Sequence, residues 1–240
     1  MNTADGPVAH LRVAPELRIF LPVARRREWQ EVPLDGTSTV GHLIRSIGIP
    51  LTEVAPLDAA RVPAGGEVVD VRPMPRPQRV EGEPRFLLDV HLGTLARRLR
   101  LLGLDAAYHN DRDDPELVAQ ANEERRVLLT QDRGLLHRAA LWLGAYVRGS
   151  DPDEQLRDVL DRFAPPLRPW TRCTACNGEL RAVGKDQVAG RLPDGTKRSY
   201  DVYGQCADCG QVYWRGAHSG RLEEIVRAAC ERVTDGSATA

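Results

Sequence analysis

Acidic side chains follow four segments of strand-like character in the middle of the chain, at the point where each segment ends. They are Asp89 after RFLL (85–88), Asp111 to Asp114 after LDAAYH (104–109), Asp132 after VLLT (127–130) and Asp151 after YVRG (146–149). Helical segments separate these strands, and such alternation predicts an α/β domain with a parallel sheet covered on both faces. Sites in such sheets lie at the carboxyl ends of the strands, so we expect the acids to meet at one edge.

Clustered carboxylates repel one another and stay ionised together only when a cation compensates their charge. Hard oxygen ligands favour Mg²⁺ or Mn²⁺, ions that bind substrate phosphate and activate water for in-line displacement. The sequence has no G-x-x-x-x-G-K-[ST] loop, which argues against a nucleotide-driven kinase or ATPase. We therefore expect phosphodiester hydrolysis at a Mg²⁺ or Mn²⁺ site formed by the acids.

Two of the candidate acids have a second interpretation. Asp114 and Asp151 each precede a proline at an expected helix start, so each fits a helix N-cap as well as a metal ligand. Asp111 and Asp113 compete with Asp114 for the role of second acid. Considered alone, Asp132 fits a cap for a helix over 135–143. Considered together with the other acids, it is better interpreted as a metal ligand.

Four of the five cysteines form two C-x-x-C pairs, Cys173 with Cys176 and Cys206 with Cys209. Two thiolates three residues apart in a tight turn reach one ion, and two such turns complete a closed, structural zinc site. The 29 residues between the pairs include RLPDGTKRSYDVY, which is expected to form a hairpin with Asp-Gly at its turn. Two disulfides are the alternative, which the lack of a secretion signal disfavours.

The N-terminal part has the strand-strand-helix-strand order of a small β-grasp module. LRIFLPV (17–23) and WQEVPL (29–34) are expected strands, TSTVGHLIRSIGI an amphipathic helix ending at Gly48, and AGGEVVDVRP a final turn and strand. This order resembles ubiquitin-like sulfur-carrier proteins. Because the chain continues past the position of their terminal Gly-Gly, we expect a docking or structural module and not a sulfur carrier.

Composition and chain breaks indicate a multidomain protein of the cytoplasm. The 240 residues are 42% hydrophobic and 28% charged, with no membrane span and no signal peptide expected. Pro-rich breaks divide the chain as follows: a β-grasp domain over 1–75, a linker over 76–84, an α/β domain over 85–165, a zinc ribbon with the four paired cysteines as ligands over 170–220, and a helix and tail over 221–240.

The segment FLLDVHLGTLARRLRLLGLDAAYHNDRDDPELVAQANEERRVLLTQDRGLL resembles the PIN-like RNase domain of the mut-seven C-terminal type. The resemblance continues through SDPDEQL and the cysteine pairs to YWRGAHSGRL, about residues 84–222. Bacterial relatives join this RNase domain to an N-terminal ubiquitin-like module. The resemblance implies a PIN-like fold, a fused zinc ribbon, and metal-dependent RNase activity.

By motif position the resemblance carries metal-ligand roles to Asp89, Asp132 and Asp114, and makes Asp151 the optional fourth acid. Arg97 and Arg98 lie in the family's L-A-R-x-L-R stretch, where we expect a contact to phosphate or to an acid. A solvated helix face is the alternative, since the expected helix buries its leucines and turns Arg97, Arg98 and Arg100 away.

The zinc ribbon carries basic and aromatic residues that fit single-stranded RNA by phosphate contact and stacking. They are Lys185, Arg191, Lys197, Arg198, Tyr200 and Tyr203. Core tyrosines in an ordinary hairpin are the alternative, and His218 is expected to be a packing residue. The favoured function is thus a ribonuclease whose substrate is tRNA, rRNA or mRNA. The alternative is a non-catalytic RNA- or ribosome-binding adaptor that docks through the ubiquitin-like module.

Overall fold

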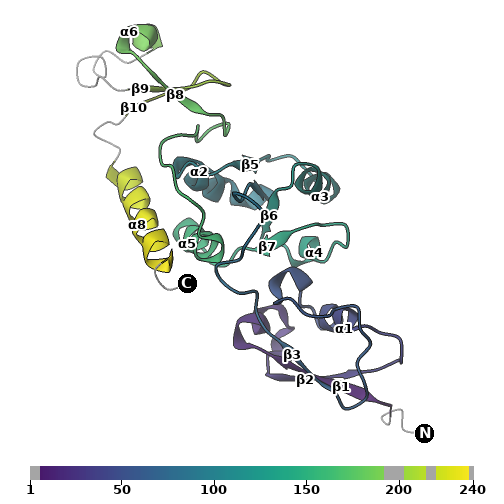
Figure 1. The fold of residues 1–240 in the computed structure, drawn as a ribbon. Coiled ribbons are helices and arrows are strands. Elements are labelled where there is room, and N and C mark those ends of the chain that lie inside the picture. Colours follow the sequence, from purple (N-terminus) through teal and green to yellow (C-terminus); the bar gives the residue numbers. More distant parts are fainter. Residues whose placement is uncertain (1–5, 192–202, 215–219, 238–240) are drawn as a thin grey trace. The chain divides into compact units, whose positions relative to one another are not determined.

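The computed structural model describes residues 6–191, 203–214 and 220–237 (Figure 1). The chain divides into two compact units, Met1–Arg76 with Thr130–Tyr146, and Pro77–Leu129 with Val147–Ala240. The five segments expected from sequence stay a prediction, and the structure adds that a mid-chain segment belongs with the N-terminal unit. No helix in the described ranges has the length and apolar character needed to cross a membrane.

The first unit contains a three-stranded sheet in the order β2-β1-β3. Strand β1 (Val8–Val13) pairs antiparallel with β2 (Trp29–Pro33) and parallel with β3 (Val68–Val71). Helix α1 (Val40–Ser46) begins after Thr39, whose hydroxyl accepts a hydrogen bond from the His42 amide. The chain reverses after the helix at Gly48, which has a φ of +99°. The mixed sheet with one helix matches the β-grasp order predicted from sequence.

The predicted first strand over 17–23 is wrong. Pro15–Phe20 forms a 3-10 helix, a second short one follows at Val23–Arg25, and a third lies at Leu51–Glu53. Leu17 and Phe20 are both buried, and a spacing of three residues brings them to one side of a 3-10 turn. The true first strand, Val8–Val13, alternates buried Ala9, Leu11 and Val13 with more exposed neighbours, which is the period-two pattern that should have decided the assignment.

The mid-chain segment of the first unit holds helix α4 (Arg133–Leu136) and strand β7 (Gly144–Tyr146). Helix α4 is shorter than the helix predicted over 135–143 and begins two residues earlier, and Leu135 and Leu136 are its buried residues. The predicted strand over 146–149 begins two residues earlier and ends at Tyr146, ahead of Gly149 with its φ of +104°.

The parallel sheet predicted from sequence is confirmed. Its order is β5-β4-β6-β7, and β4 (Phe86–Leu88) pairs parallel with β5 (Ala106–Tyr108) and with β6 (Val127–Thr130). Besides α4, which follows β6, three α-helices and one short 3-10 helix follow these strands. They are the 3-10 turn Val90–Leu92, α2 (Gly93–Leu101), α3 (Asp114–Glu123) and α5 (Pro152–Phe163).

Two details of the helices differ from expectation. Leu92, Leu95, Leu99 and Leu102 are buried as predicted, but Arg100 is buried with them and is only 4% exposed. The N-cap of α3 is Asp113, which forms a capping box with Glu116, so Asp114 is the first helical residue. Gly103 ends α2 at a φ of +81°, where a Cβ would lie 1.9 Å from the Arg168 carbonyl oxygen.

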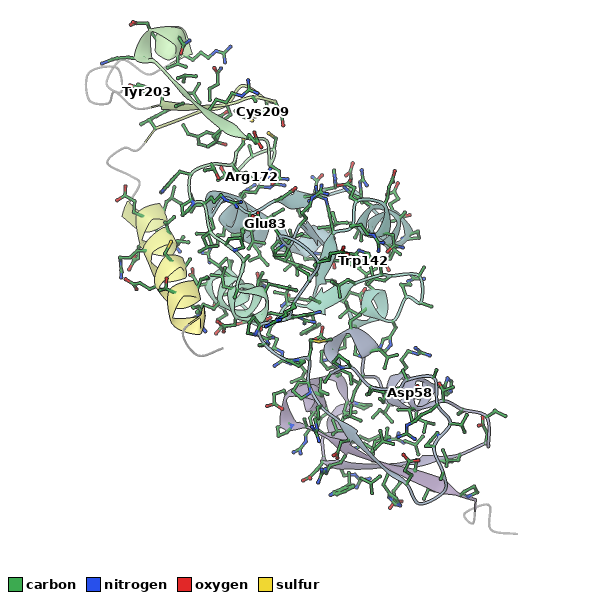
Figure 2. The ribbon with its side chains drawn as sticks, in the orientation of Figure 1. Asp58, Glu83, Trp142, Arg172, Tyr203 and Cys209 are labelled. Atoms are coloured by element: carbon green, nitrogen blue, oxygen red, sulfur yellow. The ribbon has the colours of Figure 1, made fainter. Side chains whose placement is uncertain are left out.

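The second unit also contains a small antiparallel sheet in the order β10-β9-β8. Its strands are β8 (Leu180–Val183), β9 (Tyr203–Cys206) and β10 (Val212–Trp214), with α6 (Lys185–Val188) and a 3-10 turn (Ala189–Arg191) after β8. Tyr203 is buried with Val188 and Val212 (Figure 2), so the prediction that it stacks on RNA is wrong for this residue and the alternative of a core tyrosine holds. Its apolar ring completes a core that this small sheet otherwise lacks.

Helix α8 (Gly220–Ser237) follows, and the predicted helical segment around Cys230 is confirmed. Ala229 is buried on it and Cys230 is half-buried. The predicted Asp-Gly turn of the ribbon hairpin, and with it Lys197, Arg198 and Tyr200, lies outside the described residues, as does His218.

Candidate metal centre and carboxylate edge

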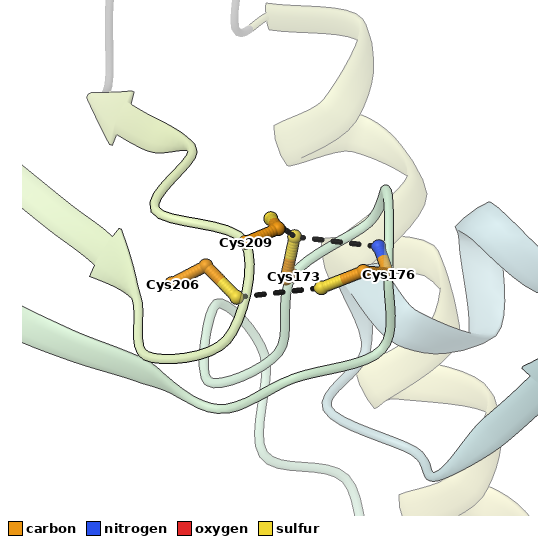
Figure 3. A group of neighbouring side chains, drawn as sticks. All are labelled: Cys173, Cys176, Cys206 and Cys209. Carbon is orange, nitrogen blue, oxygen red and sulfur yellow. Dashed lines mark hydrogen bonds between the residues drawn. The ribbon is translucent and has the colours of Figure 1, made fainter.

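The four paired cysteines converge on one point (Figure 3). Their sulfur atoms all lie within 4.8 Å of one another, and Cys173 is 3.7 Å from Cys209 while Cys176 is 3.4 Å from Cys206. A tetrahedral Zn²⁺ with bonds of about 2.3 Å separates its sulfur ligands by about 3.8 Å. The thiols are free and unbridged, so the site matches the ligand number, type and spacing of a closed metal centre and not two disulfides.

The turns around each pair explain how two sulfurs reach one point. Asn177 follows the first pair with a φ of 76° and Gly210 follows the second with a φ of 73°. In the first turn the Cys176 amide points at the Cys173 sulfur over 3.5 Å. Gly178 has no room for a side chain, because a Cβ there would lie 2.9 Å from the Cys206 sulfur and 2.4 Å from the Asp208 carboxylate.

The four sulfur atoms oppose one another's ionisation. Although burial opposes ionisation, hydrogen bonds from the Tyr213 hydroxyl and from backbone amides lower the pKa of Cys173 to about 7. Burial and the neighbouring sulfurs raise the pKa of Cys176 to about 12. One thiolate thus opposes the next, and all four ionise together only with a bound metal ion.

The first cysteine turn is bound to the large parallel sheet through Arg100. The guanidinium Nη1 donates to the carbonyl oxygens of Thr174 and Ala175 over 3.2 and 2.7 Å. Its Nε donates to the carbonyl oxygen of Ala106, the first residue of β5, over 2.8 Å. Burial lowers the pKa of Arg100, whereas Cys176 and Cys173 act in the opposite direction.

Asn177 makes a second connection between the cysteine turn and the sheet. Its side chain donates to Asp105 over 2.7 Å and accepts from the Ala106 amide over 3.0 Å. Asp105 also accepts from Arg126, which reaches the carbonyl oxygen of Phe86 at the start of β4. Although burial opposes it, hydrogen bonds from Arg126 and Asn177 lower the pKa of Asp105 to about 2.

These contacts fix the end of the sheet at which the cysteines lie. Asp105, Ala106 and Phe86 are at the amino ends of β4 and β5, whereas Asp89 follows the carboxyl end of β4. The thiolate centre and Asp89 are therefore at opposite ends of the strands. An ion bound by the four cysteines would have no ligand position left for water, so the thiolate centre is of the structural type.

Asp89 is the most enclosed of the predicted acids, with 8% of its surface exposed. Its backbone amide donates to the Leu129 carbonyl oxygen of the neighbouring strand, and its Oδ1 accepts from the Val90 amide over 2.6 Å. It thus caps the 3-10 turn that follows β4.

Asp132 is exposed and caps α4, where its Oδ1 accepts from the Gly134 amide over 2.7 Å. The Asp132 amide donates in turn to the hydroxyl of Thr130, a fully buried side chain at the end of β6. The Thr130 hydroxyl thereby holds the backbone of Asp132 in place.

The remaining predicted acids differ in their surroundings. Asp151 is the N-cap of α5 and accepts from the amides of Asp153 and Glu154, which lowers its pKa. Asp114 is half-buried in the first turn of α3, and Asp111 is exposed. Among the described residues, the four cysteines are the one group of three or more metal-ligating side chains whose ligand atoms come within 4.8 Å of one another. The three acids Asp89, Asp114 and Asp151, which belong to the second compact unit, do not form such a group.

The two predicted phosphate-binding arginines differ in their surroundings. Arg97 is exposed on α2, while Arg98 is largely covered and donates to Asp153 over 2.6 Å. Sequence reasoning missed the roles of Arg100, Asp105, Asn177 and Tyr213. The signal available for Arg100 was its position one residue after Leu99, on the edge of the apolar face.

Two family models match separate parts of the sequence. The family model described as the Mut7-C RNAse domain matches residues 84–226, and the one described as Mut7-C ubiquitin matches residues 6–79. Neither a search of curated proteins nor a search of solved structures found a match to the chain.

Proposed function

This chain belongs to the Mut7-C RNAse domain family, and we propose that it is a ribonuclease that hydrolyses RNA phosphodiester bonds with Mg²⁺ or Mn²⁺. The family match over more than half of the chain supports ribonuclease activity, and the ubiquitin-like match supports an N-terminal module for protein interaction. The finer proposal concerns the residues, the ions and the PIN-like character of the domain.

The observation that carries the carboxylate mechanism is the pairing of β4 with β6. The two strands are parallel neighbours with Leu88 opposite Leu129, and each is followed within three residues by an acid, Asp89 or Asp132. Acids that follow neighbouring parallel strands extend from the same edge of a sheet. We assign Asp89 and Asp132 as the first metal ligands, with Asp114 and Asp151 completing the set at the same edge.

In this proposal the carboxylates hold the ion, which when bound stabilises phosphate charge and activates water. Thr130 keeps the Asp132 backbone in place through its hydroxyl. Arg97, exposed on α2, binds a phosphate oxygen of the substrate. Arg98 binds a second phosphate oxygen once its hydrogen bond to Asp153 is replaced by one to the RNA. Lys197 and Arg198 of the ribbon extend the phosphate contacts along the RNA.

The four cysteines hold structural Zn²⁺, and Tyr213 orients Cys173 through its hydroxyl. Cysteine ligands stay reduced in the cytoplasm, and we place the protein there. The substrate class is RNA, and the two metal sites serve separate purposes because the thiolate centre lies at the amino ends of the strands.

The test is cleavage of single-stranded RNA by the zinc-loaded full chain, with Asp89→Asn and Asp132→Asn as variants. Each substitution should reduce the rate in Mg²⁺ or Mn²⁺ about 100-fold or more, because a metal ligand contributes several kcal/mol to the transition state. Glu123→Gln, an exposed acid at the other end of α3, is the matched control. Wild-type cleavage by the folded double variant would refute the carboxylate mechanism, and RNA binding that survives EDTA without cleavage would favour an adaptor.

A further inference from the structure

The segment Thr130–Tyr146, which we call the Asp132 segment, has an unexpected place in the structure. Its sequence lies within the region matched by the RNase family model, yet it forms one compact unit with the ubiquitin-like module. Two sets of contacts connect the segment to the module, one at each end, and both involve Phe20.

The first contact is made by Arg133, the residue next to Asp132. Its guanidinium carbon lies 5.6 Å from the centre of the Phe20 ring, and its Nη1 donates to the Phe20 carbonyl oxygen over 3.4 Å. A cation over an aromatic face is attracted by the negative charge of the ring face. Phe20 is 2% exposed, so the module presents a fixed ring to this arginine.

The second contact is made by Tyr146 at the end of β7. Its ring meets Phe20 edge-to-face at 5.1 Å, and its backbone amide donates to the Glu53 Oε1 over 2.8 Å. Glu53 belongs to the module and is 3% exposed. A buried carboxylate is costly unless hydrogen bonded, so this bond gives the module a strong preference for the segment in this position.

Helix α4 lies between the two contacts and cannot define its own position. It has four residues, too few for an isolated helix to be stable in water. Asp132 is its N-cap, so the orientation of α4 determines where the carboxylate points. The contacts of Phe20 with Arg133 and Tyr146 therefore restrain the turn that carries Asp132.

We propose that the ubiquitin-like module is an intramolecular positioning element, which holds the Asp132 segment through Phe20 and Glu53 so that the carboxylate is oriented for catalysis. The inference rests on the proposed function, because it assumes that Asp132 acts in RNA cleavage. It assigns the module a role within its own chain, with Phe20, Glu53 and Arg133 as positioning residues.

The experiment compares full-length Arg133→Met, Phe20→Leu and Glu53→Gln proteins with wild type in single-stranded RNA cleavage. Positioning predicts a kcat about tenfold lower in Arg133→Met and Phe20→Leu, with KM within twofold of wild type, because RNA contacts are untouched. Amide hydrogen exchange over residues 131–136 should become at least tenfold faster. Arg25→Met, which removes an exposed arginine from the same module, is the control and should change neither quantity.

The outcomes separate this inference from the proposed function. Wild-type activity of Asp132→Asn would refute the catalytic role of that acid. If Asp132→Asn is inactive but Arg133→Met and Phe20→Leu keep the wild-type kcat and the wild-type exchange rate, the positioning role is refuted. The proposed function then still stands. If Phe20→Leu unfolds, Arg133→Met decides, because Arg133 is not in the module's core. Glu53→Gln keeps an oxygen acceptor for the Tyr146 amide, so its kcat and its exchange rate should lie between those of wild type and Phe20→Leu.

Discussion

The Nη1 of Arg100, on α2, donates a hydrogen bond to the carbonyl oxygen of Ala175, which lies between the two cysteines of the first pair. A buried guanidinium needs a compensating charge, yet the hydrogen bonds of Arg100 within the described residues go to neutral carbonyl oxygens. Four thiolates around Zn²⁺ carry a net charge of about −2, which follows from the ligand set. With zinc bound to the four cysteines, Arg100 and the thiolates would therefore compensate each other's charge.

Arg100→Met should weaken zinc binding about tenfold, a change of about 1.4 kcal/mol. The substitution keeps most of the buried side-chain volume but leaves the thiolate centre without its neighbouring cation. Zinc affinity is measured by competition with a chromogenic chelator. Arg162→Met is the matched control, since Arg162 is also buried but bonds to Gln78 instead of the cysteine turn. Equal affinities of Arg100→Met and wild type would contradict the electrostatic role.

Asp105→Asn should destabilise the protein by about 2 kcal/mol at neutral pH, since a pKa lowered from 3.8 to about 2 stabilises the ionised, folded form. The folded-state pKa lies below the unfolded value, so this contribution is complete above about pH 4 and disappears as the pH falls through about 2. Urea unfolding at pH 7 and pH 3 measures it as the difference between wild type and variant. A difference that grows as the pH falls would contradict the assigned cause.

Thr130→Val should lower RNA cleavage while the protein stays folded. The substitution preserves shape but removes the hydroxyl that accepts the Asp132 amide over 2.8 Å. The Asp132 amide then loses a hydrogen bond worth about 0.5–1.5 kcal/mol, and the turn that carries the carboxylate is less firmly held. Thr130→Ser restores the acceptor and is expected to recover most of the activity. Equal rates for the valine and serine variants would show that the hydroxyl has no positioning role.

Gly178→Ala should weaken metal binding by about 1–3 kcal/mol, the usual cost of forcing atoms into a filled space. A Cβ at this position approaches the Cys206 sulfur within 2.9 Å, so a ligand has to move. The visible spectrum of the Co²⁺-substituted protein reports the ligand geometry directly. Gly190→Ala is the control in the same part of the chain, because a Cβ there meets nothing within 4 Å.

The sequence by itself determined the local features with strong short-range causes. The parallel strands at 86–88 and 127–130, the Gly103 end of α2, the Asp151 cap and the cysteine turns all follow from nearby residues. A cap needs one side chain and an adjacent amide, and a C-x-x-C turn needs four residues. Such local patterns form the same structure whatever the rest of the chain packs against.

Tertiary structure alone decided which distant residues meet. Arg100 has the same charge as Arg97 and Arg98, and only the approach of the cysteine turn, some 75 residues later, makes it a buried partner of the metal centre. Likewise, nothing in the residues around Asp132 indicates that Phe20 packs against Arg133 and Tyr146. Contacts of this kind depend on how packed surfaces fit, a property that no local pattern of charge or hydrophobicity contains.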